Sequence, residues 1–202
     1  AMLYTEFGEY GKALPLHEEC WRLRKVVLGN NHSETLSAMN SVAGLFMNQG
    51  EYGKALPLYE ECLRMRKAEI GEYHSDTLTT INNIASLYKY RGEYGKALAL
   101  HEECLRVRKA VLGENHLDTL RSMNNLASLY ESQGEYWKAL PLYEDCLRMR
   151  NVILGECHPE TLGSVNNLAC LYDSQGEFGK ALPLYEECLR GRKVVLGESH
   201  PD

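Results

Sequence analysis

The chain has 202 residues, 44% hydrophobic and 25% charged, a balance typical of a folded protein with a buried core and not of a disordered segment. Its formal net charge is -6, and acidic and basic residues are interspersed, which argues against a nucleic-acid backbone or an anionic membrane surface as the main partner. No apolar run approaches the roughly 18 residues that a membrane-spanning helix needs, and no signal-peptide pattern opens the chain.

An internal repeat organises the sequence. In rows of 42 residues, one glycine per row aligns with the next, and each is followed by Glu, then Tyr or Phe, and shortly afterwards by Lys-Ala-Leu. These glycines are Gly8, Gly50, Gly92, Gly134 and Gly176. No insertion breaks the period, so the chain is predicted to be an array of equal structural units.

Each row carries two helical patterns, named here helix A and helix B. Apolar residues at steps of three and four give each helix one buried stripe, as at Leu120, Met123 and Leu126 in a helix A. Both ends of the chain match parts of a unit, so we expect a single array over residues 1–202 that is truncated at both ends. In chain order, the predicted elements are a helix B at 9–28 and helix pairs at about 33–70, 75–112, 117–154 and 159–196.

The ends and the outer face of these helices are also predicted. Asp118 or Thr119 is expected to cap the start of a helix A, and Gly134 is expected to end it in the left-handed conformation that costs other residues more. On helix B, Glu60 and Arg64 stand four residues apart and are expected to form an ion pair worth a few tenths of a kcal/mol.

A helix pair with one small apolar face per helix cannot bury that face alone, so neighbouring pairs must stack. The sequence therefore predicts an all-α fold, an α-solenoid built from antiparallel helix pairs. The small residues Ala127, Ala139 and Cys146 are where the helices are expected to approach closely.

The spacing of key residues resembles a known repeat family. Met123, Leu126, Ala127 and Tyr130, followed by Ala139 and Tyr143, are spaced as in the tetratricopeptide (TPR) repeat. The 42-residue unit, with Asn-Asn-Leu-Ala in helix A and a histidine before the next helix A, is similar to the repeats of kinesin light chains, nephrocystin-type proteins and NB-ARC-linked TPR arrays. This resemblance covers the whole chain. It implies a right-handed TPR superhelix whose A helices line a concave groove.

Cysteines and histidines recur at the repeat period. Equivalent residues on successive packed helices stand roughly 8–10 Å apart, too far for a disulfide, so reduced and buried thiols of a cytoplasmic protein are predicted. The histidines are expected to cap helices or to bond a neighbouring backbone. The recurring residues are Cys20, Cys62, Cys104, Cys146 and Cys188, and His32, His74, His116, His158 and His200.

No catalytic arrangement is found in the sequence. Cys157 and His158 form an adjacent pair, but Cys170 lies some three helical turns further on, too far to complete a zinc site with them. The glycines are a whole repeat apart and do not form a phosphate-binding loop. We therefore predict no metal, no cofactor and no enzymatic activity.

The candidate site is the polar stripe of the A helices. Asparagine carries both a donor and an acceptor, and by resemblance to TPR proteins a ladder of asparagines would hold the backbone of an extended peptide. The alternative is that one asparagine of each doublet bonds the neighbouring helix and supports the stack. Small residues at Gly44, Ser86, Ser128 and Cys170 are expected to leave space for ligand side chains. The predicted peptide-binding residues are Asn40, Asn82, Asn83, Ser86, Lys89, Arg121, Asn124, Asn125, Ser128, Asn166 and Asn167.

Three functions are compatible with this pattern. The first is a protein-interaction scaffold that binds an extended, acidic peptide segment, because Lys89 and Arg121 would favour a carboxylate by roughly 1–3 kcal/mol per charge-assisted hydrogen bond. The second is a structural or self-assembling spacer that associates end to end through its end helices, with Trp137 as a contact on the outer face. The third, implied by the NB-ARC resemblance, is the sensor arm of a nucleotide-binding receptor.

Overall fold

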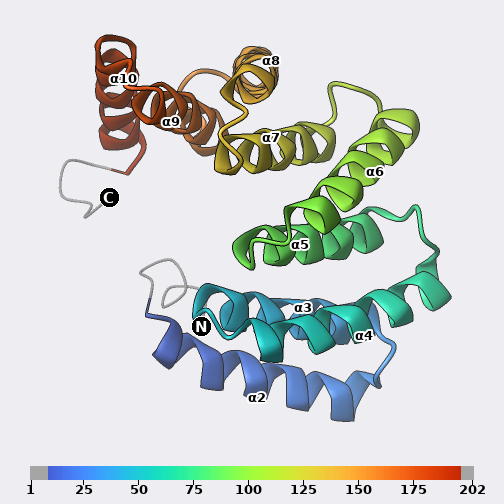
Figure 1. Ribbon diagram of the computed structural model, residues 1–202. Helices are drawn as coiled ribbons and strands as arrows, with labels where there is room; N and C mark the ends of the chain where they lie inside the picture. Colours follow the sequence, from blue (N-terminus) through green and yellow to red (C-terminus); the bar gives the residue numbers. More distant parts are fainter. Residues whose placement is uncertain (1–8, 197–202) are drawn as a thin grey trace. The chain divides into compact units, whose positions relative to one another are not determined.

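The computed structural model describes the backbone of residues 9–196, and all regular structure in this part of the chain is α-helical (Figure 1). Helices of 19 and 16 residues alternate along it. They are α2 (Tyr10–Leu28), α3 (Ser33–Asn48), α4 (Tyr52–Ile70), α5 (Ser75–Tyr90), α6 (Tyr94–Leu112), α7 (Leu117–Ser132), α8 (Tyr136–Leu154), α9 (Pro159–Ser174) and α10 (Phe178–Leu196). The odd-numbered helices are the A helices of the sequence pattern, and the even-numbered helices are the B helices. The all-α fold is confirmed.

The described residues separate into two compact units, one that ends at Leu100 and one that begins at His101, within α6. In the first unit α3 packs against α2 and α4, and α4 packs against α5. In the second unit α8 packs against α7 and α9, and α9 packs against α10. Neighbouring A helices also touch, α3 with α5 and α7 with α9. The expectation of one array truncated at both ends stays a prediction.

The two units have the same core. In the first, Ala43, Ala55, Tyr59, Ile84 and Leu87 form a buried cluster, and residues two rows later repeat it in the second. Each alanine lets two helix backbones approach, and each fully buried leucine-sized side chain contributes roughly 1.5–3 kcal/mol. The second cluster consists of Ala127, Ala139, Tyr143, Leu168 and Leu171.

A histidine begins each described A helix. Nδ1 of His116 accepts a hydrogen bond from the backbone N–H of Asp118 at 3.1 Å, and His32, His74 and His158 cap in the same way. The expected structural role of these histidines is confirmed, while His200 lies outside the described residues. The expectation of Asp118 or Thr119 as the cap was wrong, because Asp118 supplies the N–H and the Thr119 hydroxyl donates to Gly113 O at 2.8 Å.

This cap leads to a stability prediction. His116→Ala removes the acceptor from an otherwise unbonded N–H and is expected to lower the free energy of unfolding by about 1 kcal/mol. His116→Asn retains a side-chain acceptor, so it should cost only a few tenths of a kcal/mol. Urea unfolding followed by circular dichroism measures both. Equal losses in the two variants would contradict the capping role.

Glycine ends helix A as expected. Gly134 has φ +74°, and its N–H bonds Glu131 O at 2.9 Å while Glu135 N–H bonds Tyr130 O at 2.9 Å. This pair of bonds is a Schellman motif, which satisfies the last carbonyls of the helix.

Cysteines bond a helix B to the helix A that precedes it. Cys62, Cys104, Cys146 and Cys188 are buried free thiols, as predicted. The Sγ of Cys62, Cys146 and Cys188 donates to the carbonyl of a leucine in the preceding A helix, at 3.4, 3.2 and 3.5 Å. Cys20 is also free but exposed, in contrast to the prediction, because the described residues contain no A helix before α2.

Burial raises the pKa of the Cys146 thiol to about 12 from an ordinary value of 9.0. The folded state keeps the thiol neutral, so its contribution to stability is complete below pH 9 and is lost as the pH rises toward 12. We therefore expect the unfolding free energy of Cys146→Ala to fall less steeply than that of the wild type between pH 9 and pH 10, by up to about 1.4 kcal/mol per pH unit. Urea unfolding in reductant at several pH values measures this difference. Parallel curves would contradict it.

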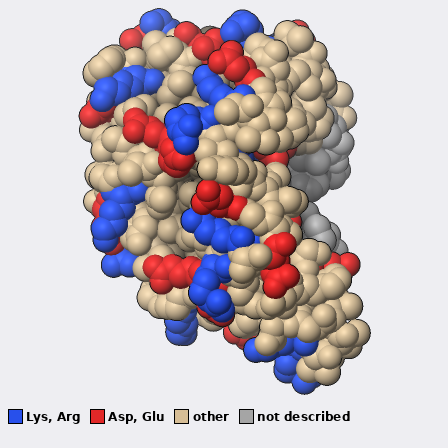
Figure 2. All heavy atoms as spheres, turned by 90° about the vertical axis from the view of Figure 1, so that its right-hand side faces the viewer, with Lys and Arg blue, Asp and Glu red and all other residues tan. Residues whose placement is uncertain are grey.

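Charged side chains on the B helices pair within their own helix. Arg64 bonds Glu61 through Nε and Nη2 at 2.9 and 2.7 Å. The expected partner Glu60 was wrong, because Glu61, three residues before the arginine, receives both arms of the guanidinium. Arg22 and Arg106 pair in the same way, and Arg148 bonds Asp145 through Nη2 at 2.7 Å. Figure 2 shows one face of the molecule, on which acidic and basic side chains lie next to each other. Such exposed pairs contribute little, about 0–1 kcal/mol each.

Buried arginines link three B helices, α4, α6 and α8, to the next A helix, and they were not predicted from the sequence. Arg66, Arg108 and Arg150 are almost fully buried. Nη1 of Arg66 donates to Asp76 O at 2.7 Å and to Thr80 Oγ1 at 2.8 Å, and its Nη2 donates to Ser37 Oγ at 3.0 Å. In the second unit, Arg108 and Arg150 bond a carbonyl and a hydroxyl in the same way. The helical period could have found them, since Arg66 lies four residues after Cys62 on the buried stripe.

Candidate functional site

Asparagines of successive A helices bond each other in both units. Nδ2 of Asn83 donates to Oδ1 of Asn40 at 3.3 Å, between α5 and α3. Nδ2 of Asn167 donates to Oδ1 of Asn124 at 2.8 Å, between α9 and α7. One asparagine from each doublet therefore supports the stack. All four side chains are half-buried, and each amide has further donor or acceptor capacity toward solvent.

The other asparagines are positioned differently. Asn82 is only 3% exposed, so its side chain is not presented to solvent on this face. Asn125 and Asn166 are half-buried, and Nδ2 of Asn166 lies 3.7 Å from Cys170 Sγ. Ser86 is half-buried and donates to Asn82 O, within its own helix, at 3.0 Å. The predicted set thus contains residues at the surface and residues within the stack.

Tyrosines from the B helices take the space beside the small residues. A Cβ atom at Gly44 would stand 3.3 Å from the hydroxyl of Tyr59. The Tyr185 hydroxyl donates to Cys170 Sγ at 3.4 Å, a bond that raises the pKa of Tyr185 to about 12. Tyr143 lies beside Ser128. Three of the four small positions, Gly44, Ser128 and Cys170, therefore have a phenol group of this chain beside them. The sequence did not predict this, although tyrosine recurs on helix B.

Charge on the A helices is partly compensated. Arg121 lies 2.9 Å from Asp118 and 3.7 Å from Glu160, so its guanidinium already faces two carboxylates. Lys89 is half-buried, and its Nζ lies 4.9 Å from the centre of the Tyr90 ring. Arg91 pairs with Glu93 at 2.8 Å, in the turn after α5.

The second unit is acidic at the row position of Lys89, where it has Glu131 and Asp173. Glu131 Oε2 accepts a hydrogen bond from the Tyr143 hydroxyl at 2.8 Å, and Glu131 Oε1 lies 3.5 Å from Ser174 Oγ. Burial first, and then the Glu131 carboxylate, raise the pKa of Tyr143 well above its usual range. Asp173 is exposed near the end of α9.

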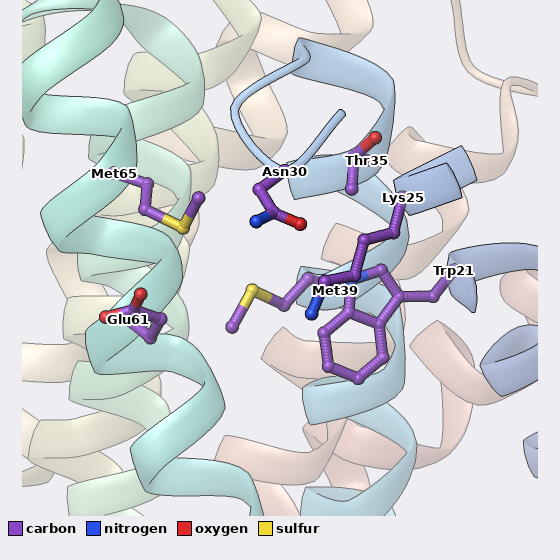
Figure 3. Close-up of a pocket in the computed structure, with 7 residues that line it drawn as sticks. All are labelled: Trp21, Lys25, Asn30, Thr35, Met39, Glu61 and Met65. Carbon is purple, nitrogen blue, oxygen red and sulfur yellow. The ribbon is translucent and has the colours of Figure 1, made fainter. Parts of the chain in front are cut away.

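A small hollow of about 100 Å³ lies between α2, α3 and α4 (Figure 3). Its lining combines apolar and polar side chains from around the hollow, namely Trp21, Met39 and Met65 with Lys25, Asn30, Thr35 and Glu61. Trp21 is half-buried against the cluster of Leu36, Met39 and Cys62, so it is a packing residue more than an exposed end surface. Within residues 9–196 no group of three or more metal-ligating side chains is found, and none of the helices there is long and apolar enough to cross a membrane.

Solved structures share this fold. A predicted kinesin light chain of Podosopora anserina with nearly identical TPR-like repeats is 23% identical with a TM-score of 0.64, over 96% of this chain and 92% of that one. BtubC (BKLC) from P. vanneervenii is 25% identical with a TM-score of 0.70, over 99% and 79%. A Rap protein complexed with competence and sporulation factor is 14% identical with a TM-score of 0.79, over 95% of this chain and 51% of that one. These likenesses are to helical repeat solenoids.

Comparison with family models also indicates a helical repeat, whereas comparison with curated proteins finds no match. Family models of the tetratricopeptide repeat match residues 1–68, 34–110 and 76–151, and a second model of the same repeat matches residues 161–202. The first three matches overlap, and the four together cover most of the sequence. The chain belongs to the tetratricopeptide repeat family.

Proposed function

We propose that this chain is a protein-interaction scaffold that holds an extended segment of a partner protein along the exposed side of its A helices. TPR repeats typically serve as non-enzymatic interaction scaffolds, and the family membership supports this role. The asparagine pairs carry the proposal. They recur in both units, and their remaining amide groups suit the carbonyl and N–H groups of a peptide backbone without regard to its sequence.

The preferred ligand is an acidic peptide, and Lys89 is the residue that selects it. The contribution of Arg121 is expected to be small, because Asp118 and Glu160 already lie next to its guanidinium. A carboxylate that bonds Lys89 would gain roughly 1–3 kcal/mol. The thiols that are free in this structure suit a cytoplasmic protein, where disulfides are rare.

A charge reversal tests the site. Lys89→Glu is expected to weaken binding of a labelled acidic peptide at least about tenfold, as measured by fluorescence anisotropy. Arg91→Glu makes the same change of charge two residues away, at a turn where the side chain pairs with Glu93, and should change affinity less than about twofold. Circular dichroism checks that both variants keep their helicity. Equal affinities of Lys89→Glu and the wild type would contradict the assignment of Lys89.

Self-association is a second candidate, favoured by apolar exposure on the end helices. Leu182 and Leu189 on α10 are 60% and 48% exposed, whereas Leu140 and Leu147, at the same row positions on α8, are half-buried. Trp137 is 74% exposed on the outer face. Light scattering at high concentration should find association that Leu182→Glu with Leu189→Glu reduces. A wild-type monomer would exclude this function.

The sensor-arm alternative depends on sequence outside these 202 residues and stays a prediction.

A further inference from the structure

A tyrosine-lined hollow lies at one end of the A helices of the first unit. Its volume is about 190 Å³, and Met47 and Asn48 at the end of α3 form one wall. The other lining residues are Tyr10 at the start of α2, Tyr52 at the start of α4 and Tyr90 at the end of α5. Small-molecule sites usually measure roughly 300–1,000 Å³, so the fitting occupant is a short stretch of a chain that continues beyond the hollow.

Two of the three aromatic rings of this hollow are parallel. The rings of Tyr52 and Tyr90 are parallel within 3°, with centres 6.5 Å apart, and Tyr90 is 56% exposed. Within the described part of the chain, no hydrogen bond engages the hydroxyl of Tyr10, Tyr52 or Tyr90. The hollow therefore offers flat aromatic surface together with phenol groups and an amide that other side chains do not use.

Charge narrows the choice of occupant. All five lining residues are uncharged, so nothing in the lining compensates a buried ion. The Lys89 ammonium lies against the Tyr90 ring at 4.9 Å and disfavours a second cation on that ring. An uncharged ligand fits best.

The second unit lacks this feature. Serine stands there at the row position of Tyr90, as Ser174, and glutamate stands at the position of Met47, as Glu131. Ser174 Oγ lies 3.5 Å from Glu131 Oε1. Tyr136, the counterpart of Tyr52, has no such aromatic neighbour at that position, which makes it a matched control.

We infer that this hollow binds a proline-rich segment of the partner in the polyproline II conformation. Proline rings are uncharged and pack on aromatic faces, and aromatic-lined grooves are a recurring way to bind such segments. A polyproline II backbone makes no internal hydrogen bonds, so its carbonyls are available to the tyrosine hydroxyls and to the amide of Asn48. The inference rests on the proposed function, since it specifies part of the extended segment that the A helices hold.

The test uses a fluorescein-labelled decaproline peptide and a glycine-serine peptide of equal length. Fluorescence anisotropy with the whole chain should find at least about tenfold tighter binding of decaproline. Tyr90→Ser, which gives the first unit the residue of the second, is expected to remove this preference. Tyr90→Phe keeps the ring and should retain most of it, and Tyr136→Ser should change it less than about twofold.

Three results would overturn the inference. One is that the wild type shows no preference for decaproline. Another is that Tyr90→Ser binds decaproline as tightly as the wild type. A third is that Tyr136→Ser weakens binding as much as Tyr90→Ser. If the wild type lacks the preference but still binds an acidic peptide through Lys89, the proposed function stands without the tyrosine site. If no peptide of any composition binds, both fail.

Discussion

Replacing Arg66 by alanine is expected to lower the free energy of unfolding by about 1–3 kcal/mol for each buried acceptor that loses its donor and finds no other. Three hydrogen bonds end on this guanidinium, and it joins α4 to both α3 and α5. Without Arg66, the Thr80 hydroxyl and the Asp76 carbonyl would keep only the 3.2 Å bond that Thr80 Oγ1 donates to Asp76 O, and the Ser37 hydroxyl would lose its donor, next to a cavity the size of the removed side chain. Arg66→Lys should recover little, because one ammonium cannot reproduce the planar fork.

Arg64 is the control for this experiment. It lies two residues from Arg66 on the same helix, and its 69% exposed side chain bonds Glu61 on the surface. Arg64→Ala should therefore cost less than about 1 kcal/mol. Urea unfolding followed by circular dichroism compares the two variants. Similar losses in both would mean that the buried hydrogen bonds do not stabilise the repeat.

Tyr143→Ala is expected to cost about 3–5 kcal/mol of stability, since it removes a large side chain from the core of the second unit. Tyr143 is 1% exposed and packs with Ala127, Ala139 and Leu168. The variant would open a cavity beside Ser128, where a ligand side chain was expected from the sequence.

Tyr143→Phe separates packing from hydrogen bonding. It keeps the ring and loses the hydroxyl, with its bonds to Glu131 and Ser128, so it should cost about 1 kcal/mol for each bond lost. Thermal or urea unfolding gives both values. A loss below about 1.5 kcal/mol for Tyr143→Ala would mean that the phenol does not hold α7 and α8 together.

Local features of this fold were predictable from its sequence. The helices follow from apolar residues at steps of three and four. Gly134 ends a helix because glycine readily adopts the positive φ angle found there. The histidines could be assigned to the fold because they recur with the repeat. Which residue caps helix A was harder, because His116 and Asp118 both suit helix starts and only the backbone geometry decides between them.

Contacts between repeats were less predictable. Arg66 was missed because a charged side chain is normally assigned to the surface, although its position on the buried stripe pointed inward. For the asparagine doublets, the sequence left two roles open. One such bond joins Asn124 to Asn167, the first member of one doublet to the second member of the next, and this choice depends on the register of two packed helices. The hollow at Tyr90 likewise depends on Tyr52, a residue of another helix.

The buried arginines also bear on how the chain folds. Arg66 reaches Asp76 and Thr80, and Arg150 reaches Glu160 and Ser164, so these contacts span only 10 and 14 residues of sequence. Proteins dominated by such short-range contacts have low contact order and fold in microseconds to milliseconds, and a repeat array can nucleate at any of its units. Each arginine becomes fully bonded only when the next A helix has formed. Once one unit has formed, its arginine therefore favours growth of the folded region toward the C-terminus.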